Sequence, residues 1–125
     1  MLILEDFRAR VADRLLQGAA ITRIPEWLCK NTFIKSSPFS FKDHEFQIEI
    51  AGDTALDLVC MKCAQVGLSE LQARITLALM ALKTGFTAIY VLPTQGFAQK
   101  FAKGRFDPII VQSEKLSRLA TAGAN

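Results

Sequence analysis

The sequence predicts an α/β domain in which a parallel sheet is flanked by helices. Two apolar runs, residues 56–61 and 88–92, have the length and composition of buried strands. Between them, residues 69–83 repeat leucine and isoleucine at three- and four-residue spacing, which is typical of a helix with one apolar face. Strand, helix and strand in this order predict two parallel strands joined by a right-handed crossover.

Length, composition and charge are those of one globular domain. The chain has 125 residues and half of them are hydrophobic, so we expect an apolar core. The net charge of +3, from 15 basic and 12 acidic residues, permits a nucleic-acid partner without indicating one. We see no apolar run long enough to cross a bilayer, and Glu5 and Asp6 argue against a signal peptide. We therefore expect a cytoplasmic protein with no membrane partner.

The N-terminal part is expected to lead into the domain. Residues 2–17 have apolar side chains at helical spacing, and Gly18 stands where that helix would end. From residue 24 to residue 41 the pattern is irregular and predicts a loop-rich segment, anchored by Trp27, Phe33 and Phe39. We divide the chain into a helix and lead-in at residues 1–24 and the main domain at residues 25–125.

Two elements flank the apolar run at residues 56–61. Residues 46–50 alternate apolar and polar side chains, which predicts an exposed strand before a turn at Gly52 and Asp53. The helix at residues 69–83 is expected to end at Gly85.

The C-terminal elements are predicted from their capping residues. Thr94 can cap a helix that runs to about residue 103 and stops at Gly104. Residues 109–111 are expected to form a short strand, and Ser113 to cap a last polar helix.

The loop at residues 62–69 joins a predicted strand to a predicted helix, which is the setting of a phosphate-binding P-loop. There, backbone N–H groups at a helix N-terminus face an anion. In the usual pattern, G-x-x-x-x-G-K-[ST], lysine contacts the phosphates and the hydroxyl ligates Mg²⁺. Gly67 and Ser69 fit this pattern, whereas Lys62 replaces the first glycine and Leu68 replaces the lysine. Lys62 could still bring its ammonium to the phosphates from the other end of the loop.

Cys60 and Cys63 form a CxxC pair that allows a metal or redox interpretation. No second pair follows, and His44 is the only histidine. We therefore favour reduced thiols in or beside a buried strand.

Three segments in register resemble the ATPase core of bacteriophage terminase large subunits. Residues 62–70 resemble the deviant Walker A motif of the lambda-like branch, in which the lysine is displaced to the start of the loop. Upstream, residues 39–47 resemble the aromatic-and-glutamine stretch that contacts adenine in that family. Downstream, residues 90–108 resemble its next strand and helix, through Tyr90, Pro93, Thr94, Phe97, Ala98, Phe101, Arg105 and Pro108. The resemblance spans residues 25–116.

The resemblance implies an incomplete P-loop NTPase-like fold and an ATP-binding part of a DNA-packaging motor. ATP and Mg²⁺ would be the ligands, with Ser69 on the metal. The implied nucleotide-binding residues are Phe46, Gln47, Lys62, Gln65, Gly67 and Ser69. Family partners would be double-stranded DNA, the small terminase subunit and the portal, with homo-oligomers possible, in the cytoplasm of a bacterial host.

The family's later catalytic parts have no counterpart in this sequence. Neither Asp57 nor Asp107 follows a hydrophobic strand as a Walker B acid should, and no nuclease domain fits after residue 116. The resemblance therefore implies a truncated product, either a prophage remnant or a deliberately shortened chain, with little turnover of its own. A helicase-like P-loop ATPase fragment and a non-catalytic interaction module are the alternatives.

Four side chains keep two interpretations each. Gln47 is either an adenine reader or an exposed strand glutamine, and His44 is more simply a surface residue than a ligand. Arg105 could reach a neighbouring subunit's nucleotide, although a solvated arginine after a helix end is the simpler reading. Glu70 would favour the first helical turn through the helix dipole, and its role near phosphates stays open.

Overall fold

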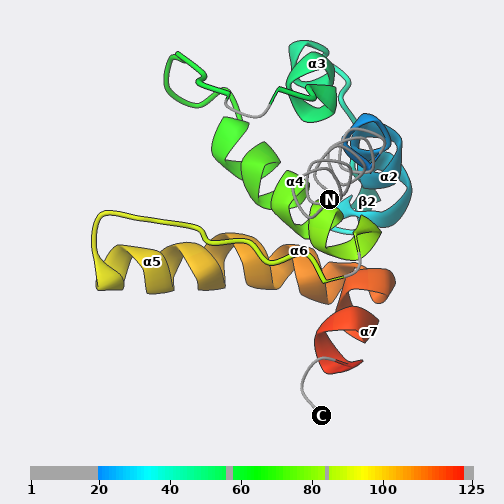
Figure 1. Ribbon diagram of the computed structural model, residues 1–125, viewed down its shortest axis with the longest axis vertical. Helices are drawn as coiled ribbons and strands as arrows, with labels where there is room; N and C mark the ends of the chain where they lie inside the picture. The colour runs from blue at the N-terminus through cyan, green and yellow to red at the C-terminus, as the bar shows by residue number, and fades with distance from the viewer. Residues whose placement is uncertain (1–19, 56–57, 84, 123–125) are drawn as a thin grey trace, which may run out of the picture.

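The computed structural model describes residues 20–55, 58–83 and 85–122 (Figure 1), and this part of the chain is mostly helical. Its helices are α2 (Ile24–Asn31), α3 (Phe46–Gly52), α4 (Leu68–Leu82), α5 (Gln95–Phe101), the π-helix η1 (Ala102–Phe106), α6 (Asp107–Gln112) and α7 (Glu114–Ala122). Its strands are β1 (Phe33–Ile34) and β2 (Ser37–Pro38). The helix predicted at residues 2–17 lies outside the described residues. None of the described helices has the length and apolar character needed to cross a membrane.

Helix α4 is the centre of the packing, and its prediction at residues 69–83 is confirmed to within one residue at each end. Leu71, Ala73, Leu77 and Ala78 are buried along it. α2 and α3 contact one side of α4, and the continuous rod of α5, η1 and α6 crosses on the other (Figure 1). Gly85 follows the helix with a left-handed φ of 75°, which suits a residue without a Cβ.

Two predictions for the N-terminal half are wrong. The lead-in contains helix α2, whose first turn accepts Pro25 without cost because the first N–H groups of a helix have no intrahelical partner. Residues 46–50 belong to helix α3 and form no strand. Five alternating residues are too few to distinguish the two periods, and the helical spacing of Gln47 and Ala51 buries both on one face. Trp27 and Phe39 are buried anchors as predicted.

The C-terminal caps are confirmed, but two further predictions fail. Thr94 Oγ1 accepts a hydrogen bond from the Phe97 N–H, and Ser113 Oγ accepts one from the Leu116 N–H. Gly104 does not stop the helix, because the chain continues through η1 into α6. Residues 109–111 are therefore helical, and Ile109 is buried against the hydrophobic core.

The predicted parallel sheet is not seen in the described part of the chain, where the only ladder is the antiparallel pair β1–β2. Residues 58–61 and 88–92 are neither helix nor strand and pair with no neighbour. Val59 and Met61 are almost wholly exposed, as are Ile89 and Val91. A strand satisfies its backbone through adjacent strands, so an apolar run without neighbours cannot form a buried sheet.

Candidate nucleotide-binding site

The loop at residues 62–67 leads from the extended segment into the N-terminus of α4. Gln65 and Gly67 both have left-handed backbones, with φ of 59° and 75°. Gly67 is the N-cap of α4, and its carbonyl accepts the first helical hydrogen bond, from Leu71 N–H at 3.0 Å. The first N–H groups of any helix lack intrahelical acceptors, so this end of α4 can receive an anion.

Gln47 holds this loop in place from helix α3. Its side chain is 5% exposed, and its Nε2 donates a hydrogen bond to the Val66 carbonyl at 2.9 Å. A Cβ built on Gly67 would lie 2.9 Å from the same nitrogen. Glycine is therefore required at residue 67 both by its φ and by the closeness of Gln47. The interpretation of Gln47 as an exposed strand residue is wrong, because the amide is buried on a helix.

Lys62 and Ser69 line one pocket of about 510 Å³ beside the loop. Its other polar residues include Asp53, Cys60 and Gln72, and most of the remaining lining consists of apolar side chains of α2, α3 and α4. The Lys62 ammonium is exposed and donates a hydrogen bond to the neighbouring Cys63 carbonyl at 3.4 Å, and among the residues that the structure describes it forms no ion pair with an acidic group. Ser69 is exposed in the first turn of α4. A cation and a hydroxyl therefore share one pocket at the helix N-terminus.

The other two candidate residues lie on the surface and outside this pocket. Phe46 begins α3 and is half exposed, with its ring centroid 6.0 Å from that of His44. Gln65 is exposed in the loop. The structure thus places Lys62 and Ser69 in one pocket, and it joins Gln47 to Val66 by a hydrogen bond, next to Gly67.

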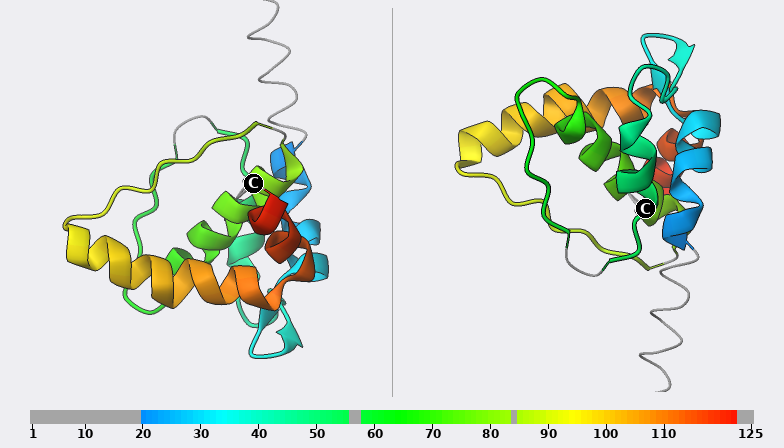
Figure 2. Two further views of the ribbon diagram at one scale, coloured as in Figure 1. Left: turned by 90° about the horizontal axis from the view of Figure 1, so that it is seen from below. Right: turned by 90° about the horizontal axis from the view of Figure 1, so that it is seen from above.

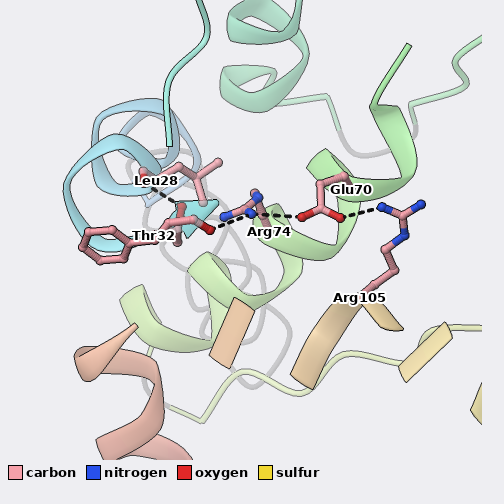
Figure 3. A network of polar contacts seen from close by, with 6 residues as sticks. Leu28, Thr32, Glu70, Arg74 and Arg105 are labelled. Carbon is pink, nitrogen blue, oxygen red and sulfur yellow. Dashed lines mark hydrogen bonds and ion pairs between the residues drawn. The ribbon is translucent and has the colours of Figure 1, made fainter. Parts of the chain in front are cut away.

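The sequence did not predict a polar network at the first turn of α4 (Figure 3). Glu70 lies between two guanidinium groups, with Arg74 Nη2 at 2.9 Å and Arg105 Nη1 at 3.0 Å from its carboxylate oxygens. Burial lowers the pKa of the Arg74 guanidinium, and the Glu70 carboxylate offsets part of that effect. The four-residue spacing of Glu70 and Arg74 on one helix was a usable signal. No local pattern could connect Glu70 with Arg105, 35 residues later.

The cysteine pair lies next to the pocket, where Cys60 is one lining residue. Cys60 and Cys63 are both exposed and unbridged, which agrees with the expected reduced thiols, but the described residues form no buried strand beside them. Within the described ranges, no group of three or more histidine, cysteine or acidic residues is arranged to hold a metal ion.

A comparison with protein families assigns this loop and its helix to an ATPase class. The family described as phage terminase large subunit gpA, ATPase domain, matches residues 43–125, well over half of the chain. The chain therefore belongs to this family, and the resemblance seen in the sequence is confirmed. No curated protein and no solved structure matches it. The matched range includes Gln47, the loop and Arg105, and an ATPase domain implies nucleotide binding.

Proposed function

We propose that the chain is the ATP-binding portion of a phage DNA-packaging motor. The observation that carries this proposal is the shared pocket of Lys62 and Ser69 at the left-handed entry to α4. An N-terminal helix end supplies N–H groups, and an adjacent ammonium adds charge, which together suit a polyphosphate. The match to the terminase ATPase domain supports ATP as the nucleotide.

Each loop residue has a distinct role in this proposal. Lys62 neutralises phosphate charge, and the backbone around Gly67 and Gln65 surrounds the phosphate oxygens. The Ser69 hydroxyl suits Mg²⁺, which prefers oxygen ligands and usually retains several waters. The ion would neutralise charge on the bound phosphates.

We propose that Gln47 and Phe46 contact the adenine base. One N–H of the Gln47 amide is engaged by Val66. An amide has a second N–H and an acceptor oxygen, which is the combination that the adenine edge requires. The half-exposed ring of Phe46, one residue earlier on α3, could stack on the base. In this arrangement, adenine recognition would be coupled directly to the backbone of the phosphate loop.

We propose that residues 25–125 form the ATP-binding domain and that this domain works as one component of the DNA-packaging motor. The fold proposed for the motor is a parallel P-loop NTPase sheet, to which residues 58–61 and 88–92 would contribute strands. Its partners would be double-stranded DNA, the small terminase subunit, the portal and other copies of the chain. We propose that it acts in the bacterial cytoplasm.

Isothermal titration of ATP with Mg²⁺ tests the loop. Lys62→Ala should weaken binding about tenfold, because a charge-assisted contact to phosphate is lost. Lys100→Ala removes another exposed lysine, on α5, and serves as the matched control. Equal affinity of folded Lys62→Ala and Lys100→Ala would refute the role of Lys62.

The same preparation should show no steady-state hydrolysis. Hydrolysis needs a positioned water and a fully held metal ion. Asp107 begins helix α6 and follows no strand, so it does not provide a Walker B acid. Sustained phosphate release by the purified 125-residue chain would show that these requirements are met in another way.

An interaction module is the second candidate, favoured by the exposed apolar side chains of residues 58–61 and 88–92. Surfaces of this kind often mark contacts with other proteins. The two candidates differ in one measurement, because a module without nucleotide chemistry would not bind ATP at all.

A further inference from the structure

A second pocket, of about 350 Å³, lies between the β1–β2 hairpin, α4 and the η1–α6 part of the helical rod. Three cationic side chains line it, Lys35, Arg74 and Arg105, against the single carboxylate of Glu70. Glu70 and Arg74 lie on the face of α4 opposite Leu68 and Gln72, which line the nucleotide pocket. The two pockets are therefore separated by the body of the helix.

Arg74 is the buried cation of this second pocket. Its side chain is 2% exposed, and its guanidinium lies 4.8 Å from the centroid of the Phe39 ring. Nη2 donates to the Phe33 carbonyl at 3.0 Å and to Glu70, whereas Nε and Nη1 have no partner within the described residues. Buried polar groups normally have partners. A guanidinium left half satisfied beside a pocket favours an anionic ligand there.

Arg105 supplies a second guanidinium at the rim. It is half exposed and shares Glu70 with Arg74, so one carboxylate faces two arginines. This sharing leaves excess positive charge in the pocket, to which Lys35 adds another. Planar guanidinium groups match the oxygen geometry of phosphate, and exposed ones can rotate to reach it.

Lys35 is held at the rim by a strained turn. The hairpin turns through Lys35 and Ser36, whose φ values of 46° and 71° are both left-handed. A two-residue turn with two positive φ values normally uses Asn-Gly, so lysine and serine there are disfavoured. Backbone strain of this kind concentrates at binding sites. The hairpin projects from the body beside α6 (Figure 2). Lys35 in its turn is exposed.

We propose that this pocket binds a phosphate group through Lys35 and Arg105, above the buried charge of Arg74. It goes beyond the proposed function, because neither Lys62 nor Ser69 contributes to it. The phosphate could belong to a nucleic-acid backbone or to a small free anion. The projecting hairpin leaves the rim accessible to either source.

Three substitutions test the proposal. Lys35→Asn removes the charge and places in the turn a residue that tolerates a left-handed backbone. Arg105→Gln removes the rim guanidinium but keeps a hydrogen-bonding side chain. The control is Lys103→Gln, which removes an exposed cation from the same π-helix outside the pocket. Circular dichroism and thermal unfolding establish that each variant is folded.

Two probes distinguish the sources of the phosphate. A short fluorescent DNA duplex is titrated by anisotropy at several salt concentrations, and inorganic phosphate is titrated by calorimetry. For a DNA backbone, each pocket variant should weaken duplex binding about fivefold and lower the salt slope by roughly 0.9, whereas Lys103→Gln should not. For a free anion, only the phosphate titration should weaken, by a similar factor.

The proposal is overturned if the wild type binds neither probe, or if both pocket variants bind both probes as well as Lys103→Gln does. If Arg105→Gln does not fold, the binding measured for Lys35→Asn is enough to test the pocket. Lys35 has no part in the ion pairs of Glu70 with Arg74 and Arg105, so this substitution leaves them intact. Lys62→Ala is scored only by ATP titration, because inorganic phosphate can also bind beside Lys62 in the nucleotide pocket. Failure here and failure of the ATP site are thus separate results.

Discussion

Helix α4 and the extended segments at residues 58–61 and 88–92 are all rich in apolar residues but differ in burial. Leu71 and Leu77 of α4 are buried, whereas Val59 and Val91 are 94% and 82% exposed. The segments still alternate as strands do. Leu58, Cys60 and Lys62 face the nucleotide pocket, while Val59 and Met61 face solvent.

This difference follows from where each element finds its backbone partners. A helix satisfies its own N–H and C=O groups and needs only one packed face. A strand needs neighbouring strands on its edges before its apolar side chains can be buried on both faces. The described residues supply helices that cover α4 but no strand beside either segment. The helical part is therefore the self-sufficient part of the fold.

The largest expected effect is in amide hydrogen exchange. The backbone amides of α4 are hydrogen-bonded inside a packed helix, and those of the two segments are not in any ladder. We expect the segments to exchange at least about a hundredfold faster than the centre of α4. Mass spectrometry of peptides from both regions measures this ratio. Similar protection in both would mean that the segments are paired in solution.

The next largest effect concerns matched truncations. Leu77→Ala removes a buried side chain from α4 and should lower the free energy of unfolding by about 2–4 kcal/mol. Val91→Ala removes an exposed one and should change it by less than about 0.5 kcal/mol. Urea denaturation of both variants gives the comparison. A large loss for Val91→Ala would place this side chain in a buried interface.

Gly67, where the extended segment meets α4, should show an intermediate effect. Gly67→Ala should cost about 1–2 kcal/mol for its left-handed backbone, and more because of Gln47 Nε2. Gly104→Ala is the control, since its Cβ meets nothing within 4 Å and its helical setting favours alanine. Denaturation of both variants measures the difference.

A double substitution separates the two causes at residue 67. In a Gln47→Ala background, Gly67→Ala should cost only its backbone part. An unchanged cost in that background would mean that the contact with Gln47 does not contribute.

The sequence was sufficient where a signal was local. The apolar spacing of residues 69–83 and the caps Thr94 and Ser113 predicted α4, α5 and α7, because those interactions lie within a few residues. The prediction of buried strands failed because burial in a sheet depends on partners far away in the chain. The alternation at residues 46–50 led to the wrong prediction of a strand for a related reason. Only tertiary packing distinguishes helix α3 from an exposed strand in so short a segment.

The candidate site divides in the same way. The order of residues around Lys62, Gly67 and Ser69 was enough to predict a loop at the start of α4, and three segments in register were enough to predict the family. The buried hydrogen bond from Gln47 to Val66 and the pairing of Glu70 with Arg105 were not predictable. Both join residues about twenty or more positions apart, and no local pattern encodes such contacts.

The smallest expected effect concerns Tyr90, the inward-facing anchor of the second extended segment and the only tyrosine of the chain. Its ring stacks on Phe101 at 5.1 Å between centroids, and its hydroxyl donates to Gln72 Oε1 at 3.2 Å. Tyr90→Phe keeps the ring and should cost only about 0.5 kcal/mol at pH 8, since one exposed hydrogen bond is lost.

The pH dependence of this cost is a sharper test than its size. Burial raises the pKa of Tyr90 above its usual value of 10.0, so the unfolded chain loses this proton first as pH rises. The wild type should therefore lose stability as the pH rises above about 10, whereas Tyr90→Phe has no such loss. All other titrating groups are common to both proteins and cancel in the difference. Urea denaturation from pH 8 upward should thus show the gap between wild type and variant closing above pH 10. A constant difference in the free energy of unfolding would mean that Tyr90 is solvated. The segment at residues 88–92 would then not be anchored to α4 and to the rod of α5, η1 and α6.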